Sequence, residues 1–127
     1  MSTRKKLFIP GAAGLVGSAL RRYLRDRYDM RLMFHRTIPD NLAPDNEIVV
    51  SDLSNFEGMV EAGAGVDVII HLGIAKAKQG FPRSRYNQMI MDTNIQGTYN
   101  IFESARINKV PKVIFASSNA VTGMYEQ

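Results

Sequence analysis

A short apolar segment runs into three glycines that are spaced three residues apart and that open an amphipathic helix. The glycine segment reads Gly11-Ala-Ala-Gly14-Leu-Val-Gly17, and it follows Leu7-Phe-Ile. Gly11 permits a tight turn, Gly14 lets another group approach the backbone, and Gly17 lets the helix pack closely on a sheet. This strand, turn and helix predict the first half of a βαβ unit, and they restrict the chain to folds built on a parallel sheet.

The same turn predicts a ligand. The first N–H groups of a helix have no intrahelical acceptor and the helix dipole is positive at that end, so a diphosphate is favoured there. A nucleoside triphosphate loop needs a lysine and then Ser or Thr after its last glycine, whereas Gly17 is followed by Ser18-Ala19. We therefore expect a dinucleotide to contact the following residues: Gly11, Ala13, Gly14, Leu15, Val16 and Gly17.

Short apolar runs alternate with helical patterns along the whole chain. Strands are predicted at 7–9, 30–34, 47–50, 66–72 and 113–116, and helices at 15–27, 56–60 and 86–108, the second helix capped by Ser54 or Asn55. The alternation predicts one α/β domain over residues 1–127, a doubly wound parallel Rossmann sheet with strand order 3-2-1-4-5. Ligands are expected beyond the carboxyl ends of the strands, between the first strand and the fourth.

Composition narrows the classes of function. The 127 residues are 45% hydrophobic and 22% charged, which is typical of a globular chain. Without cysteine there is no disulfide or thiolate metal site, and we predict no metal site at all. The net charge is +4, but the arginines at 21, 22, 25 and 27 are interpreted as a solvated helix face, so no nucleic-acid partner is predicted. No membrane segment or signal peptide is visible, which favours a cytoplasmic protein.

The end of the second strand indicates which dinucleotide is preferred. An acidic side chain there normally binds the ribose hydroxyls of NAD, and an arginine accommodates the extra phosphate of NADP. That position falls at Phe34 or His35, neither of them acidic, and Arg36 follows. The cofactor is therefore NADP or NAD, with NADP favoured because the carboxylate is missing and the Arg36 guanidinium can bind a phosphate. We expect both His35 and Arg36 to contact the cofactor. An ordinary loop arginine is the alternative for Arg36.

The glycine spacing and four later segments resemble the short-chain dehydrogenase/reductase superfamily, in its extended branch, the NAD-dependent epimerase/dehydratase family. The later segments are Asp52-Leu53, His71-Leu-Gly-Ile74, Asn94-Ile-Gln-Gly-Thr-Tyr-Asn100 and Phe115-Ala-Ser-Ser-Asn-Ala-Val121. Within that branch the chain is most similar to the amino-terminal half of the uronate dehydrogenases, which oxidise hexuronic acids to lactones. The resemblance implies hydride transfer at a hydroxyl of a sugar or a sugar acid.

The resemblance also implies roles for single residues. Asp52 and Leu53 would contact adenine, and Leu72 and Gly73 would lie along the cofactor. Asn94 would brace the site, Ser118 would orient the substrate hydroxyl as a catalytic residue, and Asn119 would bind a polar group of the substrate. Structural alternatives remain open: Asp52 as a cap of the next turn, His71 as a buried strand-end histidine, and Ser117 and Ser118 as strand-end hydroxyls.

Two departures from the family pattern limit what the chain is expected to do. Uronate dehydrogenases typically have a histidine after the residue corresponding to Asn119, where this chain has Ala120, and they generally use NAD. The family's catalytic tyrosine stands four residues before a lysine, and no Tyr-x-x-x-Lys pair occurs in this sequence. We expect a carboxyl-terminally truncated, cofactor-binding portion without useful turnover. The alternatives are a non-catalytic dinucleotide-binding or sensing module and a fragment that binds nothing.

The family's sheet has further strands after the fifth, and their absence from this sequence predicts an interaction with another chain. A fifth strand without a neighbour would leave an unpaired sheet edge, and such an edge favours pairing with another chain. We therefore expect self-association.

Overall fold

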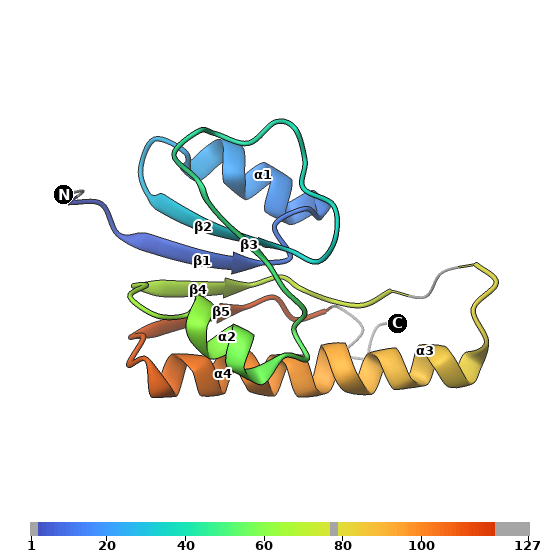
Figure 1. The fold of residues 1–127 in the computed structure, drawn as a ribbon. Helices are drawn as coiled ribbons and strands as arrows, with labels where there is room; N and C mark the ends of the chain where they lie inside the picture. Colours follow the sequence, from blue (N-terminus) through green and yellow to red (C-terminus); the bar gives the residue numbers. More distant parts are fainter. Residues whose placement is uncertain (1–2, 77–78, 119–127) are drawn as a thin grey trace, which may run out of the picture.

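The computed structural model describes residues 3–76 and 79–118 of the chain. Five parallel strands form one sheet in the order β3-β2-β1-β4-β5 (Figure 1). The strands are β1 (Lys6–Pro10), β2 (Asp29–Phe34), β3 (Glu47–Val50), β4 (Val68–His71) and β5 (Lys112–Phe115). The predicted fold class and strand order are confirmed, and the order reverses between β1 and β4 as expected.

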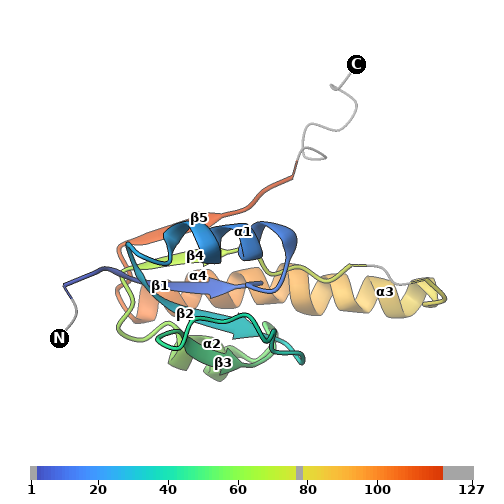
Figure 2. The same cartoon turned by 90° about the horizontal axis from the view of Figure 1, so that it is seen from above.

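Helices cover both faces of this sheet. They are α1 (Leu15–Leu24), α2 (Phe56–Ala62), α3 (Arg83–Met89), the π-helical η1 (Ile90–Gln96) and α4 (Gly97–Ile107). Helix α1 lies on one face, whereas α2 and α4 lie on the other, so the sheet is doubly wound (Figures 1 and 2). Helix α3 projects past the carboxyl edge of the sheet and continues through η1 into α4 (Figure 1). No helix of the described ranges is long and apolar enough to span a membrane.

Alternation along the strands divides the hydrophobic core into two layers. Leu7 and Ile9 of β1 belong to the layer under α1, together with Leu32 and Phe34 of β2. Phe8 points to the opposite layer, which α2 and α4 cover. Both faces of β1 are therefore buried, as is typical of a central strand in a parallel sheet.

Polar side chains of α4 bind α2 and the loop before it from within the second layer. Asn100 donates to the carbonyl oxygen of Leu53 at 2.8 Å, and Ser104 donates to that of Met59 at 2.6 Å. Both side chains are fully buried. A buried hydroxyl or amide is stabilising only when it is hydrogen-bonded, so these contacts fix how α4 and α2 pack against each other.

Several boundaries differ from the sequence predictions. The third helical region starts at Arg83 and contains a π-helical stretch where an unbroken α-helix was predicted. Strand β4 is shorter than predicted at both ends, and α1 ends at Leu24. Of the two predicted caps of α2, Asn55 is the one that accepts a hydrogen bond, from the backbone N–H of Gly58 at 3.1 Å.

The interpretation of the arginines at 21, 22, 25 and 27 as one solvated helix face is wrong at Arg21. Arg22, Arg25 and Arg27 are exposed, but only 8% of Arg21 is exposed. Arg21 follows Gly17 by four residues, so the two share the face of the helix that packs on the sheet.

Candidate functional site

The loops that follow β1 and β4 meet at the carboxyl edge, where the strand order reverses. The backbone N–H of Leu72 donates to the carbonyl oxygen of Pro10 at 3.0 Å, which continues the pairing of the two strands past their ends. Gly11 and Gly73 are the next residues along the two loops. Parallel sheets bind ligands at such a place, because the helix crossovers on opposite faces leave a crevice there.

Gly11 needs to be glycine for two separate reasons. Its φ is +82°, a left-handed conformation that residues with a side chain rarely adopt. A Cβ atom at Gly11 would also lie 2.5 Å from the backbone nitrogen of Gly73. The bend after β1 therefore depends on contact with the β4 loop as well as on local geometry.

Gly17 is tightly surrounded by the backbone of the turn, whereas Gly14 has open space around it. A Cβ atom at Gly17 would lie 2.7 Å from the carbonyl oxygens of Gly11 and Ala12, so the helix packs directly on the turn. At Gly14, the N-cap of α1, the nearest contact would be the Gly11 carbonyl at 3.5 Å, an ordinary van der Waals distance. Gly14 and the adjoining Ala13 are exposed, and 91% of Leu15 is exposed. The amino end of α1 is thus open to a ligand.

The loops after β2 and β3 meet through a histidine and a carboxylate. His35 Nε2 lies 3.0 Å from Asp52 Oδ2, and both residues are partly exposed to solvent. Phe34 is buried in the core, so His35 and Arg36 are the exposed residues at the end of β2. Of the two positions that sequence spacing allowed for ribose contact, His35 is the accessible one.

Asp52 also caps the turn that follows it. Its Oδ1 accepts hydrogen bonds from the backbone N–H of Ser54 at 2.9 Å and from the Ser54 hydroxyl at 2.8 Å. Partial burial raises the pKa of the Asp52 carboxyl. The hydrogen bonds from Ser54 and the nearby His35 lower that pKa by more than burial raises it, so the pKa lies below its usual value. The structural alternative for Asp52 is therefore present in the molecule, and a role toward adenine would be additional.

Leu53 lies beneath the site. Its side chain is buried, and a Cβ atom added to Gly73 or to Gly97 would lie 2.6 Å or 2.7 Å from it. Leu53 therefore fills the space between the β4 loop and the start of α4. Leu72 and Gly73 are half-buried on the other side of that contact.

His71 is a buried, hydrogen-bonded residue at the end of β4. Its Nδ1 accepts from the backbone N–H of Gly73 at 3.3 Å, so the ring hydrogen is on Nε2 and donates to Thr98 Oγ1 at 2.9 Å. The ring stacks on Phe115 with 5.5 Å between centroids. Burial lowers the pKa of His71 to about 4, so the ring is neutral at pH 7. The structural interpretation of His71 is confirmed.

Asn94 and the serines occupy the remaining positions around the edge. Asn94, in η1, accepts from the backbone N–H of Ala75 at 2.7 Å and donates to the Ala75 carbonyl at 3.3 Å, which ties the β4 loop to the helix. Ser117 and Ser118 are exposed and follow β5. Asn119 lies outside the described residues.

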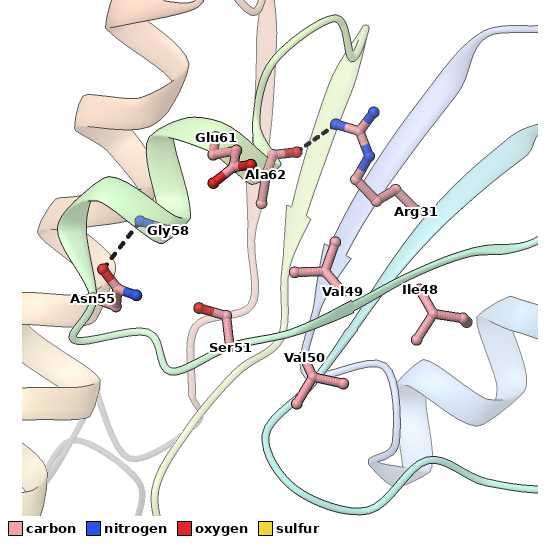
Figure 3. Close-up of a pocket in the computed structure, with 9 residues that line it drawn as sticks. All are labelled: Arg31, Ile48, Val49, Val50, Ser51, Asn55, Gly58, Glu61 and Ala62. Carbon is pink, nitrogen blue, oxygen red and sulfur yellow. Dashed lines mark hydrogen bonds between the residues drawn. The ribbon is translucent and has the colours of Figure 1, made fainter.

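A groove also lies between β3 and α2 (Figure 3). It encloses about 530 Å³ and is lined by Arg31, Ile48, Val49, Val50, Ser51, Asn55, Gly58, Glu61 and Ala62. An Arg31 nitrogen donates to the Ala62 carbonyl at 2.6 Å across it. None of the predicted site residues lines this groove, so the crevice at the strand reversal remains the candidate site.

Comparison with known proteins decides the family. Residues 7–127 match the model of the NAD dependent epimerase/dehydratase family. The chain belongs to the NAD dependent epimerase/dehydratase family. Its fold and the order of its motifs agree with that membership.

Two curated relatives and one solved structure are similar to this chain. A uronate dehydrogenase of Pseudomonas syringae pv. tomato is 35% identical over 123 residues, which are 96% of this chain and 42% of that protein. An NAD-dependent glucose-6-phosphate dehydrogenase of Haloferax volcanii is 34% identical over 94% of this chain and 45% of its own length. The crystal structure of a mutant uronate dehydrogenase from Agrobacterium tumefaciens complexed with NAD superimposes with a TM-score of 0.76, at 34% identity over 92% of this chain and 42% of that one.

The chain therefore spans less than half the length of these relatives.

Two residues beside the candidate site were missed in the sequence analysis, Arg21 and Thr98. Spacing could have indicated Arg21, because it stands four residues after Gly17 on the same helix face. Thr98 lies in the 94–100 segment that resembles the family, but its contact with His71 is seen only in the structure.

Proposed function

We propose that this chain is a dinucleotide-binding unit of the epimerase/dehydratase family, and that it belongs to a system that transfers hydride at a hydroxyl of a sugar or sugar acid. One observation carries the proposal. The open amino end of α1 lies beside the β4 loop at the reversal of strand order. A diphosphate in that position would meet free N–H groups and the positive end of the helix dipole.

The cofactor would extend from this point in both directions. Adenosine would lie over the ends of β2 and β3, near His35, Arg36 and Asp52, and the nicotinamide would lie toward Leu72, Gly73 and the serines after β5. When bound, the nicotinamide accepts or returns hydride. Ser118 would orient the substrate hydroxyl by hydrogen bonding, and Asn94 would hold the β4 loop against the helix.

NADP is the proposed preference at the ribose end. No carboxylate stands at the end of β2 itself, and Arg36 is exposed there to meet a phosphate. The carboxylate of Asp52, in the loop after β3, lies 3.0 Å from His35 Nε2. Calorimetric titration with NADP and with NAD tests this preference, and tighter binding of NAD would contradict it.

The substrate class rests on the relatives, which point to sugars of different kinds. A uronate dehydrogenase and a glucose-6-phosphate dehydrogenase match this chain about equally well. We therefore propose a sugar or sugar acid and assign no single one.

The sequence argues for binding without turnover by these 127 residues. The family's Tyr-x-x-x-Lys pair, which removes the hydroxyl proton, does not occur among them. The same observation favours a second candidate function, a non-catalytic binding or sensing module. Assays with uronic acids, glucose 6-phosphate and either dinucleotide should give no turnover. Turnover by this chain would refute both binding without turnover and the non-catalytic module.

The substitution Gly14→Asp tests the diphosphate site directly. A side chain fits at Gly14, and Asp is a favourable N-cap, so the variant should fold normally. Gly14→Asn is the matched control, because it has the same size and no charge. The Asp variant should bind NADP at least about tenfold more weakly than the Asn variant, because its carboxylate repels the phosphates.

Two outcomes of this calorimetric experiment would count against the proposed site. Failure of the unchanged protein to bind either dinucleotide would exclude the function itself. Equal affinities of the unchanged protein and Gly14→Asp would place the diphosphate away from α1.

A further inference from the structure

Arg21 is the most deeply buried charged side chain beside the glycine turn. Only 8% of it is exposed, whereas its neighbour Arg22 is exposed. An arginine is rarely buried to this degree without a specific set of partners, because removing its charge from water is costly.

The partners of Arg21 are carbonyl and hydroxyl groups at the turn. Its Nε donates to the Ala12 carbonyl at 3.1 Å, and its Nη2 donates to Ser18 Oγ at 3.2 Å. Ser18 Oγ in turn donates to the Ala13 carbonyl at 3.4 Å. One guanidinium thus binds two consecutive peptide groups, the first directly and the second through Ser18.

These contacts set the direction of an amide that faces the predicted ligand. The Ala12 C=O and the Ala13 N–H belong to the same trans peptide and point in opposite directions. Because Arg21 binds the carbonyl, the Ala13 N–H points away from Arg21. A cation on the carbonyl also strengthens the N–H of the same peptide as a donor. Ala13 itself is exposed.

The charge of Arg21 has no acidic partner in the part of the chain that the structure describes. The ion pairs found there join Lys6 and Arg31 to Glu47, His35 to Asp52, and Arg106 to Glu103. A buried cation without a carboxylate is unusual, and an anion bound at the adjacent turn would compensate it.

We propose that Arg21 is a positioning residue of the diphosphate site: it orients the turn through the Ala12 carbonyl, and its charge favours an anion above that turn. This inference rests on the proposed dinucleotide binding. Because Arg21 lies behind the turn, it raises affinity without touching the ligand, and it orders the turn in the free protein too.

The test compares Arg21→Gln with Arg22→Gln, which removes the same charge from the exposed face of the same helix. NADP binding, measured by calorimetry, should weaken at least about tenfold in Arg21→Gln and less than about threefold in Arg22→Gln. Arg21→Lys, which keeps the charge, should recover part of the loss. Equal effects of the two Gln substitutions would overturn the proposal.

A second measurement is made on the free protein. The ¹⁵N and amide-proton resonances of Ala13 should shift in Arg21→Gln but not in Arg22→Gln, while core amides of β1 remain protected from exchange in both. An unchanged Ala13 amide would refute the positioning role. If the unchanged protein bound no dinucleotide, the proposed function would fail, and the turn-ordering role of Arg21 would be decided by the Ala13 resonances alone.

Discussion

Single residues at the turn differ in what fixes them, and two glycines show this clearly. Gly11 and Gly65 both have positive φ, at +82° and +73°. A Cβ atom at Gly65 would meet nothing within 4 Å, whereas at Gly11 it would overlap the backbone of the β4 loop. The two positions therefore separate the cost of backbone strain from the cost of tertiary contact.

We predict a larger loss of stability for Gly11→Ala than for Gly65→Ala. Gly65→Ala should lower the free energy of unfolding by about 1 kcal/mol, the cost of a left-handed conformation. Gly11→Ala should lower it by about 2–4 kcal/mol, because displacement of the Gly73 backbone adds to that cost. Urea denaturation measures both values, and equal losses would mean that the β1 and β4 loops are not in contact.

At the scale of elements, His71 joins three of them. It belongs to β4, donates to Thr98 of α4, and stacks on Phe115 of β5. The backbone N–H of Gly73, in the loop after β4, donates to Nδ1 of the same ring. The packing of α4 against the sheet is thus linked to the protonation of one buried imidazole.

This linkage predicts a pH dependence of stability. The folded pKa of His71 is about 4 against 6.5 for an unperturbed histidine, so the unfolded state binds the proton more readily. The resulting stability is complete above pH 6.5 and is lost as the pH falls toward 4. Between pH 7 and pH 5 the free energy of unfolding should fall by about 2 kcal/mol through this residue.

The variant His71→Asn isolates that contribution. Its amide can replace the hydrogen bond of Nδ1 but does not titrate, so urea denaturation at pH 7 and pH 5 should show a smaller decline than in the unchanged protein. The carboxyls of Asp52 and Glu47, whose pKa values are also lowered, contribute equally to both proteins and cancel in the difference. Parallel declines would contradict the assignment.

For the whole molecule, the two edges of the sheet are β3 and β5. Neither has a second partner strand among the described residues. Ile114 and Phe115 of β5 are each about half exposed, and Phe102 of α4 continues this apolar surface. An apolar strand edge of this kind favours pairing with another chain.

We predict that the protein self-associates through β5. Light scattering over a range of concentrations should detect dimers or larger species, and Ile114→Lys should reduce them by placing a charge on the edge. Ile48→Lys, at the opposite edge on β3, is the matched control and should have little effect. A monomer at every concentration would refute this prediction, and equal effects of the two variants would move the contact away from β5.

Much of the fold could be predicted from the sequence, because its signals are local. The alternation of apolar runs with helical patterns sufficed for the element order, and the Rossmann topology that the glycine turn indicates then supplied the expected strand order. The glycine spacing indicated the bend after β1 in the same way. The elements and the bend depend on backbone sterics and side-chain periodicity, and both act within a few residues.

Features that depend on distant neighbours could not be predicted. The pairing of His35 with Asp52, the burial of Leu53 beneath Gly73 and the contact of Asn94 with Ala75 each join segments that are separate in the sequence. The π-helical register of η1 was also missed, as was the burial of Arg21.

The sequence by itself determined the turn, the parallel sheet and the end of the sheet where a ligand would bind. Only the tertiary structure decided which charged and polar groups at that end are exposed, paired or neutral. The physical reason is that burial and electrostatics depend on all surrounding atoms, whereas secondary structure depends mainly on each residue's neighbours along the chain.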